Sequence, residues 1–368
     1  MAGSDASPSA SLFPAARLAL ERAIAEGVCP GAVVEVGTAT APIWQEAFGR
    51  LSYDGPAVTL ATVYDLASLT KVLATSALFM QRLERGEFGL DDAVAERLTT
   101  WARPDREAGS IADLLTHRSG LPAHRPFYQH LVGRRAFEAA IATSPLTARL
   151  RTRAVYSDLG FMVLGFLLDD GPGLAARFST LLTQMRVVDD LQYLPPARWV
   201  PRIAPTEHDP WRGRLLVGEV HDENAYALGG VAGHAGLFGT GAAVGAYARH
   251  LLQVLDGRAG AFGRATLEAF ITRDRAVPGS TRALGWDTMQ PTSSCGTRLS
   301  ARAFGHTGFT GTSLWIDPER NLYVVLLTNR VHPTRGGRHG ATGIGLLRRA
   351  LHDAVAHGPD AGATRVAP

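Results

Sequence analysis

Cysteine is scarce in this chain: Cys29 and Cys295 are the only two among 368 residues. This scarcity excludes a disulfide-stabilised scaffold and the metal motifs that are built from cysteine pairs. The chain also lacks an apolar run long enough to cross a membrane, and residues 1–20 lack a basic segment followed by a continuous apolar one. We therefore expect a disordered leader over residues 1–12, no membrane anchor and a cytoplasmic location.

An excess of charge of one sign is also missing. The formal net charge is +3, and the basic residues are scattered rather than gathered in a long block, so nucleic-acid binding has no specific support. Apolar residues make up 46% and charged residues 19%, which is typical of a soluble globular protein. The expected partner is a small-molecule or short-peptide substrate, and the sequence does not determine the oligomeric state.

Strand patterns lie near both ends of the chain, with helical patterns between them. Residues 30–39 and 42–51 predict one β-hairpin, and residues 312–330 predict a second hairpin around a DPERN turn. Apolar residues at helical spacing predict helices within 13–26, 69–83, 111–122, 161–170, 241–255, 264–272 and 341–356.

This order predicts an α+β fold in which an antiparallel sheet is flanked by helices and joined to an all-helical region. Residues 13–75 and 280–356 would combine into the sheet domain, and residues 76–279 would form a mainly helical insert. Residues 357–368 would be a flexible tail. A ligand cleft is expected at the seam between the sheet and the insert.

The stretch YDLASLTKVLAT, residues 64–75, places Ser68 three residues before Lys71. Serine needs a base within hydrogen-bond reach to act as a nucleophile, and residues i and i+3 of a helix are neighbours. The helix N-terminus, with Asp65 as its expected cap, would also offer an N–H group to a developing oxyanion. Alone the pattern is weak, because chance pairings with serine are expected when 37 lysines and arginines are counted together.

Two further stretches add to this pattern. Tyr156 and Asp158 stand just before an apolar helix, where a tyrosine could share protons with Ser68 and Lys71; a core aromatic is the alternative interpretation. The stretch GHTG, residues 305–308, would let a substrate backbone approach a strand closely, and a plain edge strand with a glycine bulge is its alternative.

Taken together, S-x-x-K, Y-x-D and H-T-G in this order resemble the serine β-lactamase and penicillin-binding-protein superfamily. The resemblance covers about residues 15–355 and is closest to the class C branch, which also holds serine carboxypeptidases, D-aminopeptidases, esterases and transesterases. GLDDAV (89–94), DLLTHRSGLP (113–122) and AGHAGLFGT (232–240) are also similar to this family. This resemblance implies a β-lactamase/transpeptidase-like fold.

The resemblance also implies a role for individual residues. The implied catalytic residues are the nucleophile Ser68, its partner Lys71, the base or proton relay Tyr156, and His306. The implied oxyanion hole consists of the backbone N–H groups of Ser68 and Phe309. The implied substrate-binding residues are Asp158, Thr307 and Gly308.

Two positions depart from the family pattern. Asp158 stands where asparagine is usual, so it should hold Lys71 charged and cannot donate a hydrogen bond when ionised. We therefore expect short-chain esters to be turned over faster than β-lactams. His306 stands where many members have lysine, and its titration is expected to give a limb in the pH profile between about 5.5 and 7.5.

His221, Asp222 and His234 are residues of metal-binding types within residues 218–236. Their spacing matches no closed metal site, so we expect a loop that shapes the cleft wall. No metal and no cofactor are expected.

The function predicted from the sequence is a serine hydrolase that forms an acyl-enzyme on esters, amides or D-amino-acid peptides. An acyltransferase with the same acyl-enzyme is one alternative, since the two activities differ only in the acceptor. A non-catalytic binding or scaffold protein of the same fold is the other alternative. Loss of Ser68, Lys71 or Tyr156 would favour the scaffold protein, and all three are present.

Overall fold

A six-stranded antiparallel sheet organises the structure. The computed structural model describes residues 12–187, 190–337 and 339–358. The strand order is β2-β1-β11-β10-β9-β8. The strands are β1 (Gly31–Gly37), β2 (Pro42–Gly49), β8 (Asp287–Thr288), β9 (Phe304–Thr307), β10 (Ser313–Asp317) and β11 (Leu322–Thr328).

Both predicted hairpins are present in this sheet. β1 pairs with β2, and β10 pairs with β11, each in antiparallel register. The two ends of the chain meet at the centre of the sheet, where Val34 of β1 lies opposite Leu326 of β11. The predicted α+β fold is therefore confirmed.

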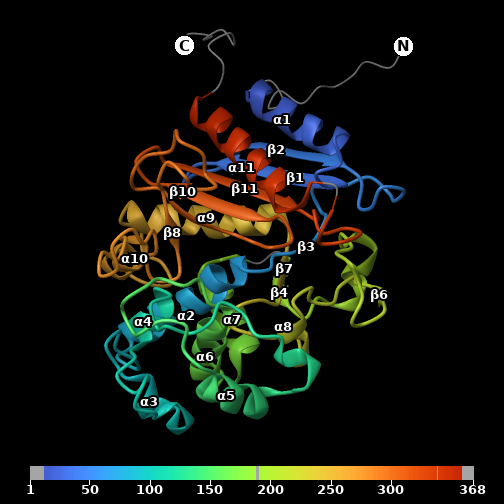
Figure 1. Cartoon of the computed structure of the whole chain (residues 1–368). Helices are drawn as coiled ribbons and strands as arrows, with labels where there is room; N and C mark the ends of the chain where they lie inside the picture. The colour runs from blue at the N-terminus through green and yellow to red at the C-terminus, as the bar shows by residue number, and fades with distance from the viewer. Residues whose placement is uncertain (1–11, 188–189, 338, 359–368) are drawn as a thin grey trace, which may run out of the picture.

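Helices cover both faces of the sheet, as Figure 1 shows: α1 (Pro14–Ala25) and α11 (Gly340–Ala356) lie on one face and α9 (Gly241–Leu255) on the other. Successive residues of a strand point to opposite faces. Val34 and Val36 accordingly pack in the core beneath α1 and α11, whereas Val33 belongs to the core on the opposite side. Burial on both faces explains why β1 is apolar almost throughout rather than alternating.

A helical region lies beyond α9. Its helices are α2 (Ala77–Glu84), α3 (Val94–Arg97), α4 (Ile111–Leu115), α5 (Arg134–Thr143), α6 (Asp158–Leu168), α7 (Leu174–Gln184), α8 (Glu223–Ala227) and α10 (Arg264–Ile271). Two small sheets accompany them, one formed by β3 (Tyr64–Asp65), β7 (Leu237–Gly239) and β4 (Leu191–Tyr193), the other by β5 (His208–Asp209) and β6 (Arg214–Leu215). Within the described ranges, no helix is both long and apolar enough to span a membrane.

The division into residues 13–75 with 280–356 and an insert over 76–279 stays a prediction. The packing of one helix does not follow it, because α9 lies in the expected insert by sequence but rests on β1 and β11 of the sheet. Its apolar side is long enough to cover the sheet face that α1 and α11 leave open. The predicted leader is outside the described residues except for residue 12, and so is the predicted tail except for residues 357–358.

Candidate active site

Ser68 lies in a tight turn that leads from β3 into a helix. Ala67 has a φ of 47°, a left-handed conformation that is uncommon for a residue with a side chain. Strained backbone of this kind persists where the surroundings hold it. The following segment, Lys71–Ser76, is a π-helical turn before α2. In this arrangement Lys71 Nζ reaches Ser68 Oγ at 2.9 Å, so the predicted neighbours are in contact.

Lys71 is fully buried and lies among several polar partners, Tyr156 included. Besides Ser68, its Nζ lies 2.7 Å from Asp158 Oδ1 and donates to the backbone carbonyl of His234 at 3.2 Å. Burial by itself lowers the pKa of Lys71, but the Asp158 carboxylate and Tyr156 outweigh burial and raise it above its ordinary value. Lys71 is therefore an ammonium group at neutral pH, as the Asp158 departure predicted.

Lys71 is also the only lysine in the chain, since the other 36 basic residues are arginine. The expectation of chance pairings with serine was therefore wrong: S-x-x-K could occur only once. Arginine cannot lose its proton in proteins, whereas a lysine can exchange one when its surroundings allow. The one lysine of the chain therefore lies beside Ser68.

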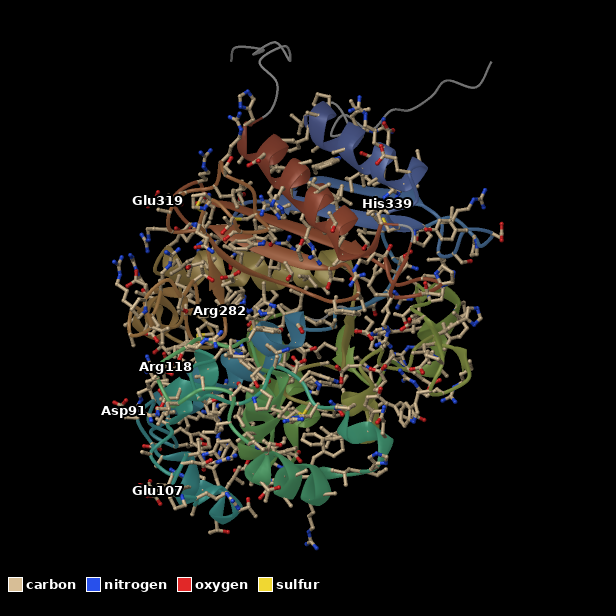
Figure 2. All side chains as sticks on the ribbon, viewed as in Figure 1. Asp91, Glu107, Arg118, Arg282, Glu319 and His339 are labelled. Atoms are coloured by element: carbon tan, nitrogen blue, oxygen red, sulfur yellow. The ribbon has the colours of Figure 1, made fainter. Side chains whose placement is uncertain are left out.

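Tyr156 lies beside Lys71, with the Nζ atom 4.9 Å from the centre of its ring. The guanidinium carbon of Arg282 is 5.0 Å from the same centre, and Figure 2 labels Arg282 between the sheet and the helical region. The rings of His117 and His306 lie 4.7 and 5.7 Å away. The half-buried tyrosine therefore stands between two cations and two imidazoles.

His306 does not have the environment of a group that titrates near neutral pH. The side chain is buried, and burial, followed by the positive charges of Arg282 and Lys71, lowers its pKa well below the ordinary value. Its Nδ1 lies 2.8 Å from the Thr307 carbonyl, which fixes that nitrogen as the donor and Nε2 as an acceptor. These surroundings disfavour the protonated imidazole, so the structure does not support the expected pH limb from His306 and leaves its Nε2 as an acceptor.

The turn after β9 brings a second backbone N–H group to the nucleophile. A side chain at Gly308 would put its Cβ 2.7 Å from the Leu66 carbonyl, so only glycine allows this approach. The Thr310 and Thr312 hydroxyls donate to the carbonyls of Asp65 and Leu66 at 2.7 and 3.1 Å. In the described part of the chain, no group accepts the N–H of Ser68 or of Phe309.

A cavity of about 680 Å³ opens over these groups. It is lined by Ala67, Ser68, His124, Tyr128, Tyr156, Asp158, His221, Asp222, Glu223, Ala235, Arg282, Asp287, His306, Thr307, Gly308, Phe309, Arg330, Arg335, Ala341, Ile344 and Arg348. Except for Lys71, which is fully buried behind Ser68, all the predicted catalytic and substrate-binding residues line it. The sequence analysis did not identify its four arginines.

Three of these arginines are not neutralised by a carboxylate. Arg335 pairs with Glu207 and Glu223 at 2.8 and 2.6 Å. By contrast, among the described residues Arg282, Arg330 and Arg348 form no ion pair. Arg348 is buried on α11 and donates to the Gly308 and Thr312 carbonyls, and burial lowers its pKa to about 9.

The loop of residues 218–236 forms one wall of the cavity. His221 Nε2 donates to Glu207 at 2.8 Å, and His234 Nε2 donates to Asp222 at 2.9 Å, so the three expected residues of metal-binding types belong to two separate pairs. Nowhere in the described ranges do three or more His, Cys, Asp or Glu side chains form a group that could hold a metal ion. Asp65 is also placed differently from the expected helix cap: its carboxylate accepts the Ala67 and His221 N–H groups.

A sheet covered by helices on both faces, a helical region beside it, and a serine, a buried lysine and a tyrosine at one cavity are together typical of the serine β-lactamase and penicillin-binding-protein superfamily. Comparisons with known proteins agree: residues 17–348 match the family described as Beta-lactamase. The chain belongs to this family.

Relatives with sequence similarity carry one recurring name. A candidate D-alanyl-D-alanine carboxypeptidase of Salmonella gallinarum (strain 287/91 / NCTC 13346) is 31% identical over 346 residues, covering 79% of this chain and 76% of the relative. A protein of the same name from Escherichia coli (strain K12) is 29% identical over 333 residues, with the same coverage of 79% and 76%.

Solved structures share the fold at lower identity. EstCE1, a hydrolase with promiscuous acyltransferase activity, superimposes with a TM-score of 0.73 at 20% identity, covering 94% of this chain and 99% of its own. A class C β-lactamase from Rhodobacter sphaeroides has a TM-score of 0.72 at 20% identity, covering 93% and 99%. These similarities establish the fold. They do not identify the activity, which has to be inferred from the residues of the site.

Proposed function

We propose that this protein is a serine hydrolase that forms an acyl-enzyme through Ser68. The observation that carries the proposal is the contact between Ser68 Oγ and the buried Lys71 Nζ, at a cavity where the Ser68 and Phe309 N–H groups have no acceptor among the described residues. Ser68 Oγ attacks the substrate carbonyl, and the N–H groups of Ser68 and Phe309 stabilise the oxyanion that forms. Collapse of this tetrahedral intermediate expels the leaving group and leaves the acyl group on Ser68 Oγ. Water then hydrolyses this acyl-enzyme ester.

Tyr156 is the group that we propose takes the Ser68 proton. Lys71 is an ammonium group held by Asp158, so it cannot accept a proton until it has released one. Its positive charge lies close to the Tyr156 ring and stabilises negative charge on the neighbouring oxygens during transfer. In the proposed step Tyr156 acts as the phenolate, accepts the Ser68 proton and passes it to the leaving group. In deacylation it takes a proton from the attacking water and returns it to Ser68 Oγ.

We further propose a substrate that carries a carboxylate, such as a peptide ending in a D-amino acid. Three cavity arginines without a carboxylate partner support an anionic substrate group, and arginine binds carboxylates in bidentate geometry. The name shared by the relatives agrees with this choice.

The proposal is tested by intact-mass measurement after incubation with p-nitrophenyl esters, penicillin and D-alanyl peptides. A mass increase equal to the acyl group, together with release of the leaving group, is the expected result. Added alcohols or amino acids would reveal an acyltransferase if they become acylated faster than water hydrolyses the ester. Absence of any covalent adduct across the panel would favour the scaffold protein instead.

Substrate charge gives a further prediction. Replacing Arg282 or Arg330 by glutamine should reduce kcat/KM for a carboxylate-bearing substrate by about 10- to 100-fold at one of the two positions, because a charge-assisted hydrogen bond contributes about 1.5–3 kcal/mol. A neutral ester should change less than about threefold. Arg335→Gln is the matched control, since its charge is already paired and both substrates should respond alike.

The steady-state rates of both substrates with all three variants measure this preference. If neither Arg282→Gln nor Arg330→Gln separates the two substrates, the cavity does not select for a carboxylate.

Asp158 gives a prediction about pH. Since the Asp158 carboxylate raises the pKa of Lys71, Asp158→Asn should lower that pKa. Because Lys71 acts as the ammonium form, the limb over which kcat/KM falls as Lys71 loses its proton should then move to lower pH. NMR of protein labelled with 13C-lysine reports this pKa directly, because the chain has a single lysine.

Asp287→Asn is the control, as Asp287 lines the same cavity but forms no ion pair with Lys71 in the described structure. A Lys71 pKa that stays the same in Asp158→Asn would mean that Asp158 does not hold the ammonium form. The restored amide should also speed the turnover of penicillins relative to short-chain esters.

A further inference from the structure

The side chain of Phe309, whose backbone N–H is the second proposed oxyanion donor, makes few contacts. The ring is 49% exposed, so burial does not fix it. Two groups contact it instead: the His221 imidazole stacks on it with 5.7 Å between ring centres and 26° between planes, and the Arg330 guanidinium carbon lies 4.7 Å from its centre. These neighbours therefore add to the Thr310 and Thr312 hydrogen bonds in setting the position of the second oxyanion donor.

His221 is in turn anchored by hydrogen bonds of its ring and of its backbone. Its Nε2–H donates to Glu207, whose carboxylate also accepts the Arg335 backbone N–H at 2.7 Å. The His221 carbonyl accepts from Arg212 Nη2 at 2.8 Å. A stacking ring that is anchored at its edge and at its backbone is a rigid support for an exposed aromatic side chain.

Asp65 connects this support to the nucleophile. One carboxylate oxygen accepts the His221 N–H at 2.6 Å, and the other accepts the Ala67 N–H at 2.8 Å, directly before Ser68. The Asp65 carbonyl accepts the Thr310 hydroxyl, one residue after Phe309. Asp65 is thus bonded to both segments that carry the two oxyanion N–H groups, and to His221.

We propose that Asp65 and His221 are positioning residues that set the distance between the Ser68 and Phe309 N–H groups. This inference rests on the proposed acyl-enzyme mechanism. Charge develops on the substrate oxygen only in the transition state, so a displaced donor weakens the transition state more than the bound substrate. The residues act on kcat without touching the substrate carbonyl.

Two substitutions at His221 separate the ring from its hydrogen bond. His221→Ala removes the stack and should lower kcat for p-nitrophenyl acetate by about 10- to 100-fold, with KM changed less than about threefold. His221→Phe keeps an aromatic ring against Phe309 and should recover most of that loss. His250→Ala, which removes a buried histidine on α9 remote from the cavity, should leave kcat unchanged.

A boronic acid supplies an independent readout. Ser68 Oγ adds to boron, and a hydroxyl of the tetrahedral adduct takes the place of the oxyanion. The inhibition constant of phenylboronic acid should rise in His221→Ala by about the same factor as kcat falls. Asp65→Asn, which keeps the side-chain shape but replaces one acceptor by a donor, should lower kcat as well, and the double variant should lose less than the product of the single losses.

Rates are expressed per active site, counted by exhaustive fluorophosphonate labelling, so unfolded protein does not contribute. Wild-type kcat and boronic acid affinity in His221→Ala would overturn the inference, as would equal losses in His221→Ala and His221→Phe. Wild-type protein that is neither labelled nor active on the ester would overturn the proposed function, and the inference with it.

Discussion

Ser68→Ala is expected to lose covalent labelling completely and ester turnover by at least about 10³-fold. The substitution removes the oxygen that attacks the carbonyl, the Oγ that lies 2.9 Å from Lys71 Nζ. The fold should be little affected, because only one hydroxyl is lost from a turn held by Asp65 and Gly308. Intact mass after fluorophosphonate treatment and the rate of p-nitrophenyl release measure the two effects.

Ser76→Ala, in the helical segment that follows Ser68, is the matched control. Its buried Oγ has no hydrogen-bond partner in the described structure, so labelling and turnover should remain at wild-type values. Retention of ester hydrolysis near the wild-type rate in Ser68→Ala would show that another residue is the nucleophile.

Lys71→Met is expected to lower turnover by about 10³-fold, as removal of a proton-transfer partner costs about 10²- to 10⁴-fold. It should also lower the free energy of unfolding. Loss of one partner of a buried ion pair costs about 3–5 kcal/mol, and the cost here should be nearer about 1–3 kcal/mol because water reaches Asp158. The Asp158 side chain is 20% exposed, whereas Lys71 is not exposed at all.

The double variant Lys71→Met with Asp158→Asn separates catalysis from stability. Removing both charges should restore most of the unfolding free energy, since no unpaired charge remains, while turnover stays low. Urea denaturation and ester hydrolysis measure the two quantities on the same samples. Recovery of turnover along with stability would mean that Lys71 serves only to neutralise Asp158.

Local sequence patterns determined most of the fold. Strand alternation and helical spacing identified both hairpins and the helices that flank the sheet, because side-chain periodicity follows directly from backbone geometry. The catalytic residue types were equally visible: Ser68 and Lys71 are three residues apart, and the contact between them is local. The uniqueness of Lys71, present in the sequence from the start, was a stronger signal than the spacing.

The tertiary structure decided everything that depends on contacts between distant segments. The bond between His221 and Asp65 spans 156 residues, and the Thr310 hydroxyl reaches the Asp65 carbonyl across 245. No periodicity encodes such pairs, so the sequence predicts a helix cap at Asp65, which is wrong, and a wall at His221, which is right but omits its bond to Asp65. The charge of His306 was misjudged for the same reason, because burial and the nearby Arg282 and Lys71, which lower its pKa, exist only in the folded chain.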